Sequence, residues 1–241
     1  MIGLGTIINV AAVMIGGFLG RFCGRFLNES CQDSLIKVSG VSVLFIAIAG
    51  TLEGMLTVTP EGLTSGGSML IVACLTLGTL IGEFLNIEDK FEAFGEWLKR
   101  KTGNSGEASF VDAFVTTSLT ICIGAMAIVG SIQDGIFGDY SILATKAVLD
   151  LIIILVMTCS MGKGCAFSAI PVGILQGSIT LLARLIQPLM TDAALANLSL
   201  VGNIMIFCVG VNLVWGKKIR VANMLPGLII AVAIAFLPFS L

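Results

Sequence analysis

The stretch SILATKAVLDLIIILVMTCS, residues 141–160, decides the fold class of this chain. It is apolar over most of its length, but it carries Lys146 and Asp150 near its middle. An α-helix of about 20 mostly apolar residues crosses the hydrocarbon core of a bilayer. The stretch therefore predicts a transmembrane helix with two opposite charges one turn apart inside the membrane.

The composition extends this interpretation to the whole chain. Of 241 residues, 56% are hydrophobic and 12% are charged, and the mean hydropathy is +1.05. Soluble domains are about 45–50% apolar and about 25% charged. Because so few charges cannot cover a globule of this size, we expect an all-α, polytopic transmembrane helical bundle whose partner is the lipid bilayer.

Several functional classes are excluded by composition. The chain has no histidine, its net charge is -2, and its seven cysteines form no C-x-x-C pair. Histidine-based catalysis, a nucleic-acid partner, a disulfide framework and a metal cluster are therefore not expected. No ATP-binding loop or protease signature is present, so we expect neither an enzyme nor a cofactor. The start of the chain lacks a basic leader region, which favours a retained first helix.

The apolar runs divide the chain into about eight spans. They lie at roughly 3–21, 35–53, 68–86, 110–131, 141–161, 166–187, 198–215 and 223–240. The alternative is seven spans with a re-entrant segment in the glycine-rich stretch 124–138.

Basic residues give the orientation of these spans. With eight spans, 11 of the 13 basic residues fall on one face, and only Lys146 and Arg184 fall on the other. The basic face is Arg21, Arg25, Lys37, Lys90, Lys99, Arg100, Lys101, Lys163, Lys217, Lys218 and Arg220. Positive residues collect in the cytoplasm, so both termini are predicted outside.

The polar connection 88–109 is predicted to form a cytoplasmic amphipathic helix and loop. Phe91, Phe94 and Trp97 recur at helical spacing, acidic residues come first, and basic residues close the segment. Such a helix lies on the inner leaflet, either as a spacer or as the docking place of a regulatory partner.

An internal repeat divides the single transmembrane domain, 1–241. Residues 37–54 align with 199–216, so that 1–87 (helices 1–3) forms a first copy and 166–241 (helices 6–8) a second, with helices 4–5 at 110–161 between them. The copies enter from opposite sides, which predicts an inverted repeat of the kind found in secondary transporters. Chance similarity between apolar helices is the alternative. Glycines spaced four apart also predict close helix packing and fit a homo-oligomer interface.

Ionisable and amide side chains within the spans are the candidate substrate- or ion-binding residues, because burying them in a membrane is costly. Asp150 and Lys146 are the principal pair, either as a coupling site or as a structural ion pair. The remaining candidates are Gln133, Asp134 and Asp139 before the fifth span, and Asn9, Gln176, Asn223 and Glu83 in other spans.

Several motifs carry a resemblance to a known family. They include GTIINVAAVMIGG at 5–17, LGTLIGE at 77–83, CIGAMAIVGSIQDG at 122–135, GDYSILATKAVLD at 138–150, SAIPVGILQG at 168–177 and VANMLPGLIIA at 221–231. In order and over nearly the whole chain, they resemble the prokaryotic membrane proteins grouped as domain of unknown function 554. The resemblance implies a bacterial or archaeal cytoplasmic membrane protein and implies no activity.

Two functional hypotheses follow. The first is a secondary transporter or channel for a small solute or ion, with Asp150 in contact with the substrate. The second is a non-transporting scaffold or sensor that signals through the cytoplasmic 87–109 helix.

Overall fold

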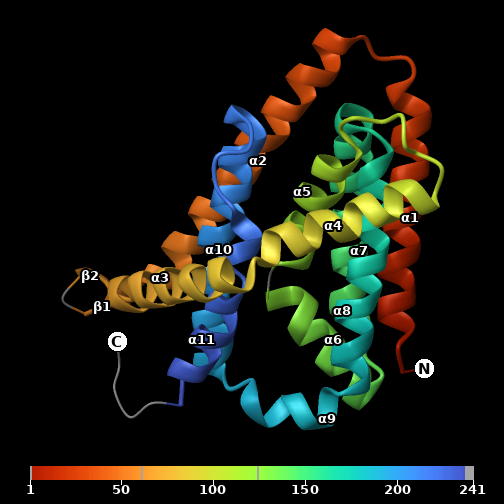
Figure 1. The fold of residues 1–241 in the computed structure, drawn as a ribbon. Helices are drawn as coiled ribbons and strands as arrows, with labels where there is room; N and C mark the ends of the chain where they lie inside the picture. The colour runs from red at the N-terminus through yellow and green to blue at the C-terminus, as the bar shows by residue number, and fades with distance from the viewer. Residues whose placement is uncertain (1, 61, 124, 237–241) are drawn as a thin grey trace.

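A computed structural model describes residues 2–60, 62–123 and 125–236, and it confirms an all-α bundle (Figure 1). The longer helices are α1 Leu4–Gly24, α2 Glu29–Met55, α3 Ser68–Leu85, α4 Ile87–Lys101, α5 Phe110–Cys122, α6 Ala125–Phe137, α7 Ser141–Met161, α8 Ala169–Leu181, α10 Asp192–Trp215 and α11 Pro226–Ile234. Short helical segments are η1 Lys163–Ser168, α9 Ala183–Ile186, η2 Gln187–Leu189 and η3 Val221–Met224.

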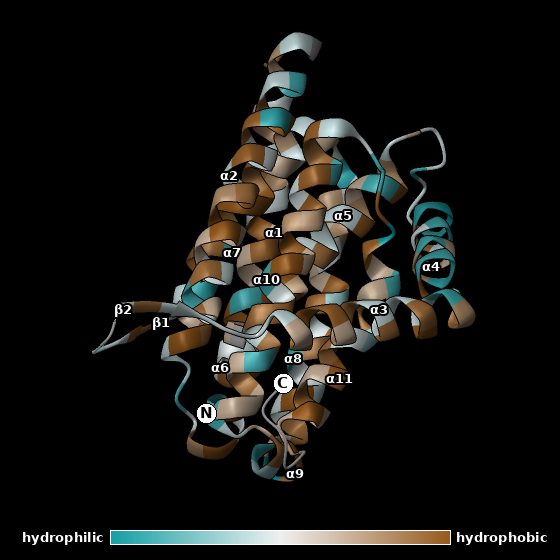
Figure 2. Cartoon of the chain, turned by 90° about the vertical axis from the view of Figure 1, so that its left-hand side faces the viewer, coloured by the Kyte–Doolittle hydropathy of each residue, from teal (hydrophilic) through white to brown (hydrophobic). Residues whose placement is uncertain are grey.

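Apolar side chains cover much of the outer surface, as expected for a bundle in lipid. Figure 2 shows that most of the length of α2 and α7 is hydrophobic. Large exposed examples are Phe18 of α1, Phe45 of α2 and Val148 of α7. We expect these faces to contact lipid, because so many large apolar side chains exposed to water would cause aggregation.

Six described helical segments are long and apolar enough to span a membrane, and a seventh span results if α5 and α6 count as one. These two helices are bent by 63°, so the span expected over 110–131 consists of two helices that run in different directions, as in a broken span or a re-entrant loop. The glycine-rich stretch around Gln133 is helical as far as Phe137. The described part of α11 has nine residues, which is shorter than the about 20 residues that a membrane span needs. The count of eight spans therefore stays a prediction, as does the re-entrant alternative.

Close packing between helices depends on glycine. A Cβ at Gly16 would lie 2.7 Å from the carbonyl oxygen of Leu151, and one at Gly20 would lie 2.5 Å from that of Leu155. The glycines spaced four apart on α1 therefore let α7 run alongside in the same direction (Figure 1). The prediction of close packing through these glycines is confirmed.

Helices that the predicted repeat matches lie against one another in antiparallel pairs: α1 with η1 and α8, α2 with α10, and α3 with η3 and α11. The close approaches are Val10–Gly173, Gly17–Ala166, Gly40–Leu213, Gly54–Leu200, Gly78–Gly227 and Gly82–Asn223. Antiparallel pairing of corresponding helices is what a two-fold axis in the membrane plane would produce. The inverted repeat itself stays a prediction.

Helix α4 forms where the sequence predicts it and runs, like α3, across the direction of α1 and α7 (Figure 1). Its start follows Asn86, which has a left-handed backbone conformation (φ 49°) that turns the chain sharply after α3. Phe91 and Phe94 pack on Phe114 of α5. Part of the apolar face expected to lie on the membrane is therefore covered by protein.

A short β-hairpin between α2 and α3 was not expected. Strand β1 Leu56–Thr59 pairs antiparallel with β2 Gly62–Ser65. The sequence LTVT is rich in β-branched residues, which favour extended backbone. Apart from this hairpin and the 3₁₀ turns, the regular structure of the described chain is α-helical.

Candidate functional site

The pair on α7 is buried in the centre of that helix. Lys146 Nζ lies 2.7 Å from Asp150 Oδ1 and 2.8 Å from Oδ2, so the ammonium contacts both carboxylate oxygens. The side chains are 10% and 3% exposed. Spacing of four residues places both on one helix face, and the structure shows that this face points into the protein.

Asn9 of α1 completes this arrangement, which we call the α7 cluster (Asn9, Lys146 and Asp150). Its Nδ2 donates a hydrogen bond to Asp150 Oδ2 at 3.0 Å. Asn9 is fully buried, and its Oδ1 has no hydrogen-bond partner among the described residues. All three residues are candidates from the sequence, but only folding brings Asn9 to the pair on α7.

Gln176 lies on α8, which packs antiparallel to α1. The hydroxyls of Thr6 and Thr180 are 3.4 Å apart, and a Cβ at Gly173 would lie 3.3 Å from Val10. Both Asn9 and Gln176 fall between these two contacts along their helices. Gln176 is buried, and its Oε1 is a further acceptor without a partner in the described chain. A buried acceptor left unpaired is costly, so both amides have capacity for a ligand. A primary amide presents its oxygen to a cation or, after rotation, its N–H groups to an anion.

Asp134 of α6 has a different role. Its Oδ1 accepts from the N–H of Gly3 at 3.1 Å, and its Oδ2 from the N–H of Gly5 at 2.9 Å. A carboxylate at the first turn of a helix satisfies free N–H groups and interacts favourably with the helix dipole. Asp134 therefore holds the start of α1 against α6 and does not hydrogen bond to the α7 cluster.

Asp139 and Gln133 lie outside the buried cluster. The exposed Asp139 accepts hydrogen bonds from the hydroxyl and the N–H of Ser141, at 2.6 Å and 3.0 Å. These bonds lower the pKa of Asp139, and they stabilise the start of α7. Gln133 is half-buried on α6.

A second buried carboxylate, Glu88, lies at the start of α4. Its Oε1 forms an ion pair with Lys217 Nζ at 2.9 Å, and its Oε2 accepts from the N–H of Ala222 at 3.0 Å. Its own N–H donates to Asn223 Oδ1 at 2.7 Å. The Glu88 side chain is 3% exposed and that of Lys217 is 45% exposed.

Arg220 extends this contact on the surface. Its guanidinium pairs with Glu83 at 2.9 Å and with Asp89. We call Glu88, Lys217, Arg220 and Asn223 the α4 clamp, because they tie α4 to the segment after α10. Two sequence candidates therefore lie at this clamp and not at the α7 cluster: Asn223 is a member of the clamp, and Glu83 pairs with its Arg220.

The charges of the clamp alter the titration of Lys217. Burial lowers its pKa, but the hydrogen bonds and negative charges of Glu88 and Glu92 outweigh that effect, so the pKa of Lys217 is raised.

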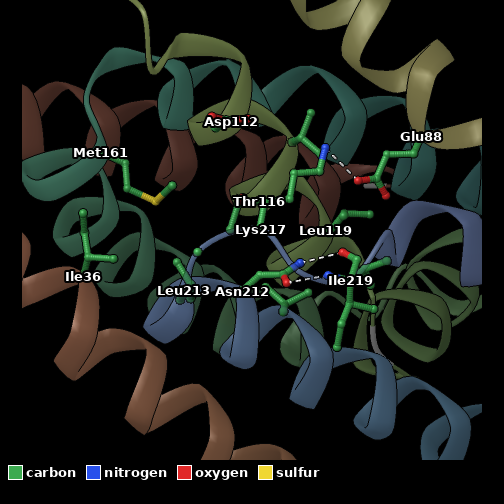
Figure 3. Close-up of a pocket in the computed structure, with 14 residues that line it drawn as sticks. Ile36, Glu88, Asp112, Thr116, Leu119, Met161, Asn212, Leu213, Lys217 and Ile219 are labelled. Carbon is green, nitrogen blue, oxygen red and sulfur yellow. Dashed lines mark hydrogen bonds and ion pairs between the residues drawn. The ribbon is translucent and has the colours of Figure 1, made fainter.

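A cavity of about 220 Å³ opens beside the clamp (Figure 3). Figure 3 shows Lys217 pairing with Glu88 on one side and Asn212 hydrogen bonding to Ile219 on the other. Asp112 of α5 also lines it. Glu88, Lys217 and Asp112 were not predicted as site residues, because each is an ordinary polar residue near a helix end. Only folding brings them together.

No metal site is evident in the described ranges, where no three His, Cys, Asp or Glu side chains gather closely enough to hold an ion.

The fold and the buried charges define a helical membrane protein with ionisable side chains inside its bundle. The chain belongs to the family described as Protein of unknown function (DUF554), whose model matches residues 4–236.

Two relatives cover almost the whole chain. It is 27% identical over 232 residues to the uncharacterized membrane protein YdfK of Bacillus subtilis, with 96% of this chain and 95% of YdfK aligned. It is 30% identical over 239 residues to the uncharacterized protein YqgA of Escherichia coli, with 96% of each aligned.

A third relative matches part of the chain. This is the fluoride-specific ion channel FluC 2 of Listeria monocytogenes, 30% identical over 99 residues that make up 41% of this chain and 72% of the relative. No solved structure matches the chain.

Proposed function

We propose that this protein is a channel or secondary transporter for a small ion in a prokaryotic cytoplasmic membrane, and that the ion passes the α7 cluster. One observation carries the proposal: Lys146 and Asp150 are buried together within an apolar helix, and Asp150 also accepts a hydrogen bond from Asn9 of another helix. Ionisable residues at such positions are costly and mark ion or substrate pathways.

The contacts of the cluster support this role over that of a plain structural ion pair. Opposite charges four residues apart on one helix already satisfy each other and tie no second helix in place. Asn9 adds an amide whose Oδ1 is left free, and Gln176 adds another at the same level of the neighbouring helix. A permeating ion needs such polar groups that exchange partners, since binding must be weak enough to allow exit.

Two further observations support transport. Corresponding helices of the predicted repeat pack antiparallel, as in transporters whose binding site lies where two inverted copies meet. The relative that matches part of the chain is a fluoride-specific ion channel, which makes fluoride the first ion to test. The cavity beside Asp112 lies at the helix ends predicted to be cytoplasmic and offers an inner entrance.

An ion-flux experiment tests the proposal. Purified protein is reconstituted into liposomes loaded with potassium fluoride, and efflux is followed with a fluoride electrode, with chloride, sodium and proton flux measured in parallel. We expect flux from the unmodified chain and at least about a tenfold loss in Asp150→Asn, because a charge-assisted hydrogen bond contributes about 1.5–3 kcal/mol.

The matched control is Asp33→Asn, which removes the carboxylate of an exposed Lys37–Asp33 pair with the same spacing of four residues. Its flux should equal that of the unmodified chain. Full flux in Asp150→Asn, or no flux of any of these ions from the unmodified chain, would contradict the proposal.

The α4 clamp favours a second candidate function, in which α4 reports a signal from the membrane domain. Its ion pairs are held by a segment that follows α10, so a shift of α10 would move α4. This function predicts that Glu88→Gln changes the exposure of α4 in a protein that conducts no ion.

A further inference from the structure

A groove between the second half of α1, η1 and the start of α8 lies apart from both clusters. It has a volume of about 670 Å³ and is lined mainly by apolar side chains of α1, η1 and α8. The apolar part includes Met14, Phe18, Ala166, Phe167 and Ile170. Met14 and Phe18 are more than half exposed, so the groove is open on the outer side of the bundle.

One end of the groove is cationic. Arg21 and Lys163 line it there, and they also line an adjoining polar pocket of about 370 Å³ together with Arg25. Lys163 pairs with Glu107 at 2.5 Å and donates to Asn104 Oδ1 at 3.2 Å. The two pockets thus have three cations and one carboxylate among their described lining residues.

Two of these cations repel each other. Arg21 and Arg25 are four residues apart at the end of α1, where like charges destabilise a helix. Neither forms an ion pair with a side chain that the structure describes. An anion between them and Lys163 would remove this repulsion, and guanidinium groups match the geometry of phosphate oxygens.

We propose that this groove binds one anionic phospholipid, with an acyl chain along Phe18 and Phe167 and the phosphate against Arg21, Arg25 and Lys163. The groove is apolar along most of its length and cationic at one end. A phospholipid has the same arrangement, with an apolar acyl chain attached to a charged headgroup. Arg21, Arg25 and Lys163 belong to the face predicted to be cytoplasmic, and basic pockets between helices on that side bind anionic headgroups. The proposal does not depend on ion transport.

The experiment measures lipid binding to the full chain in a neutral detergent by native mass spectrometry, with the unfolding temperature as a second readout. The probes are phosphatidylglycerol, phosphatidylcholine, glycerol phosphate and inorganic phosphate. We expect phosphatidylglycerol to remain bound and to raise the unfolding temperature, whereas phosphatidylcholine and both soluble phosphates have little effect.

Variants test the position. Arg21→Gln should weaken phosphatidylglycerol binding about fivefold, because each basic residue near an anionic lipid adds about that factor. Lys37→Gln, on the same predicted face but outside the groove, should bind as the unmodified chain does. Lys163→Gln is the second variant if Arg21→Gln does not fold, and Phe18→Gln tests the acyl contact.

Equal binding of phosphatidylcholine would show an unspecific apolar surface, and an equal effect of inorganic phosphate would show a simple anion site. Either result, or unchanged affinity in both Arg21→Gln and Lys163→Gln, would overturn the proposal.

Discussion

The α7 cluster and the α4 clamp each bury one carboxylate beside one lysine, yet they are built differently. Asp150 and Glu88 are equally buried, at 3% exposure, whereas Lys146 is 10% exposed and Lys217 is 45% exposed. Asp150 meets a lysine of its own helix and a side-chain amide. Glu88 meets a lysine far away in the sequence and the backbone N–H of Ala222.

The difference shows what each carboxylate is suited to do. Glu88 joins α4 to the segment after α10 partly through the backbone N–H of Ala222, which cannot rotate away as a side chain can. Its contacts therefore suit a structural role. Asp150 is held by side chains alone, which can rotate toward a passing ion. Removing the partner of either carboxylate should lower the free energy of unfolding by several kcal/mol, because it leaves a buried charge uncompensated.

The largest effect is expected when the α7 cluster loses its lysine. Lys146→Met leaves Asp150 buried without compensation, so the free energy of unfolding should fall by about 3–5 kcal/mol. The measurement is thermal or denaturant unfolding in detergent.

A double variant separates structure from transport. Lys146→Met with Asp150→Leu replaces the whole pair by apolar side chains and should recover most of the lost stability, while ion flux stays absent. A double variant as unstable as the single one would show that the loss is not due to an unpaired Asp150. A double variant with normal flux would remove the cluster from the ion path.

A smaller, local effect is expected at the α4 clamp. Glu88→Gln keeps a carbonyl acceptor for the N–H of Ala222 but loses the charge that pairs with Lys217, at a cost of about 1–3 kcal/mol. Hydrogen exchange should increase in α4 and in the segment after α10, with α1 and α7 unchanged. Glu96→Gln, on the exposed side of α4, is the control. Increased exchange throughout the bundle would mean that the clamp holds more than α4.

The clamp should also respond to high pH. Because the pKa of Lys217 is raised in the folded protein, its stabilising contribution is fully present below the ordinary value of 10.5 and is lost as the pH rises through the folded value. The clamp should therefore persist at neutral pH and open only under strongly alkaline conditions. Fluorescence of Trp97 on α4 and Trp215 beside the clamp reports this opening, and Lys217→Arg should shift it to higher pH. Opening near neutral pH would contradict the assignment.

The smallest effect is expected at the exposed pair of the same spacing. Lys37 Nζ lies 2.6 Å from Asp33 Oδ2, and both side chains are largely exposed. Exposed ion pairs contribute less than about 1 kcal/mol to the free energy of unfolding. Asp33→Asn should change the unfolding temperature little, and salt should abolish the difference. A loss comparable to that of Lys146→Met would show that burial does not distinguish the two pairs.

The sequence predicted features that depend on local pattern. The helix at 141–161, α4 after residue 86 and the glycine contacts of α1 follow from periodicity and residue size. The break between α5 and α6 lies where the sequence offered a re-entrant segment only as the alternative, because the run 110–131 is mostly apolar and its periodicity alone shows no change of direction. The hairpin at 56–65 was missed because it is short and lies between two strong helices.

Within the candidate site, the sequence determined that Lys146 and Asp150 lie on one helix face, since residues four apart on a helix always do. It also determined that this chain is a membrane protein, since its charges are too few to face water. Only the tertiary structure decided that Asn9 joins the pair, that Asp134 instead holds the start of α1, that Asn223 bonds to Glu88, and that Glu83 pairs with Arg220. Those contacts join residues far apart in the chain, and helix packing alone sets which of them meet.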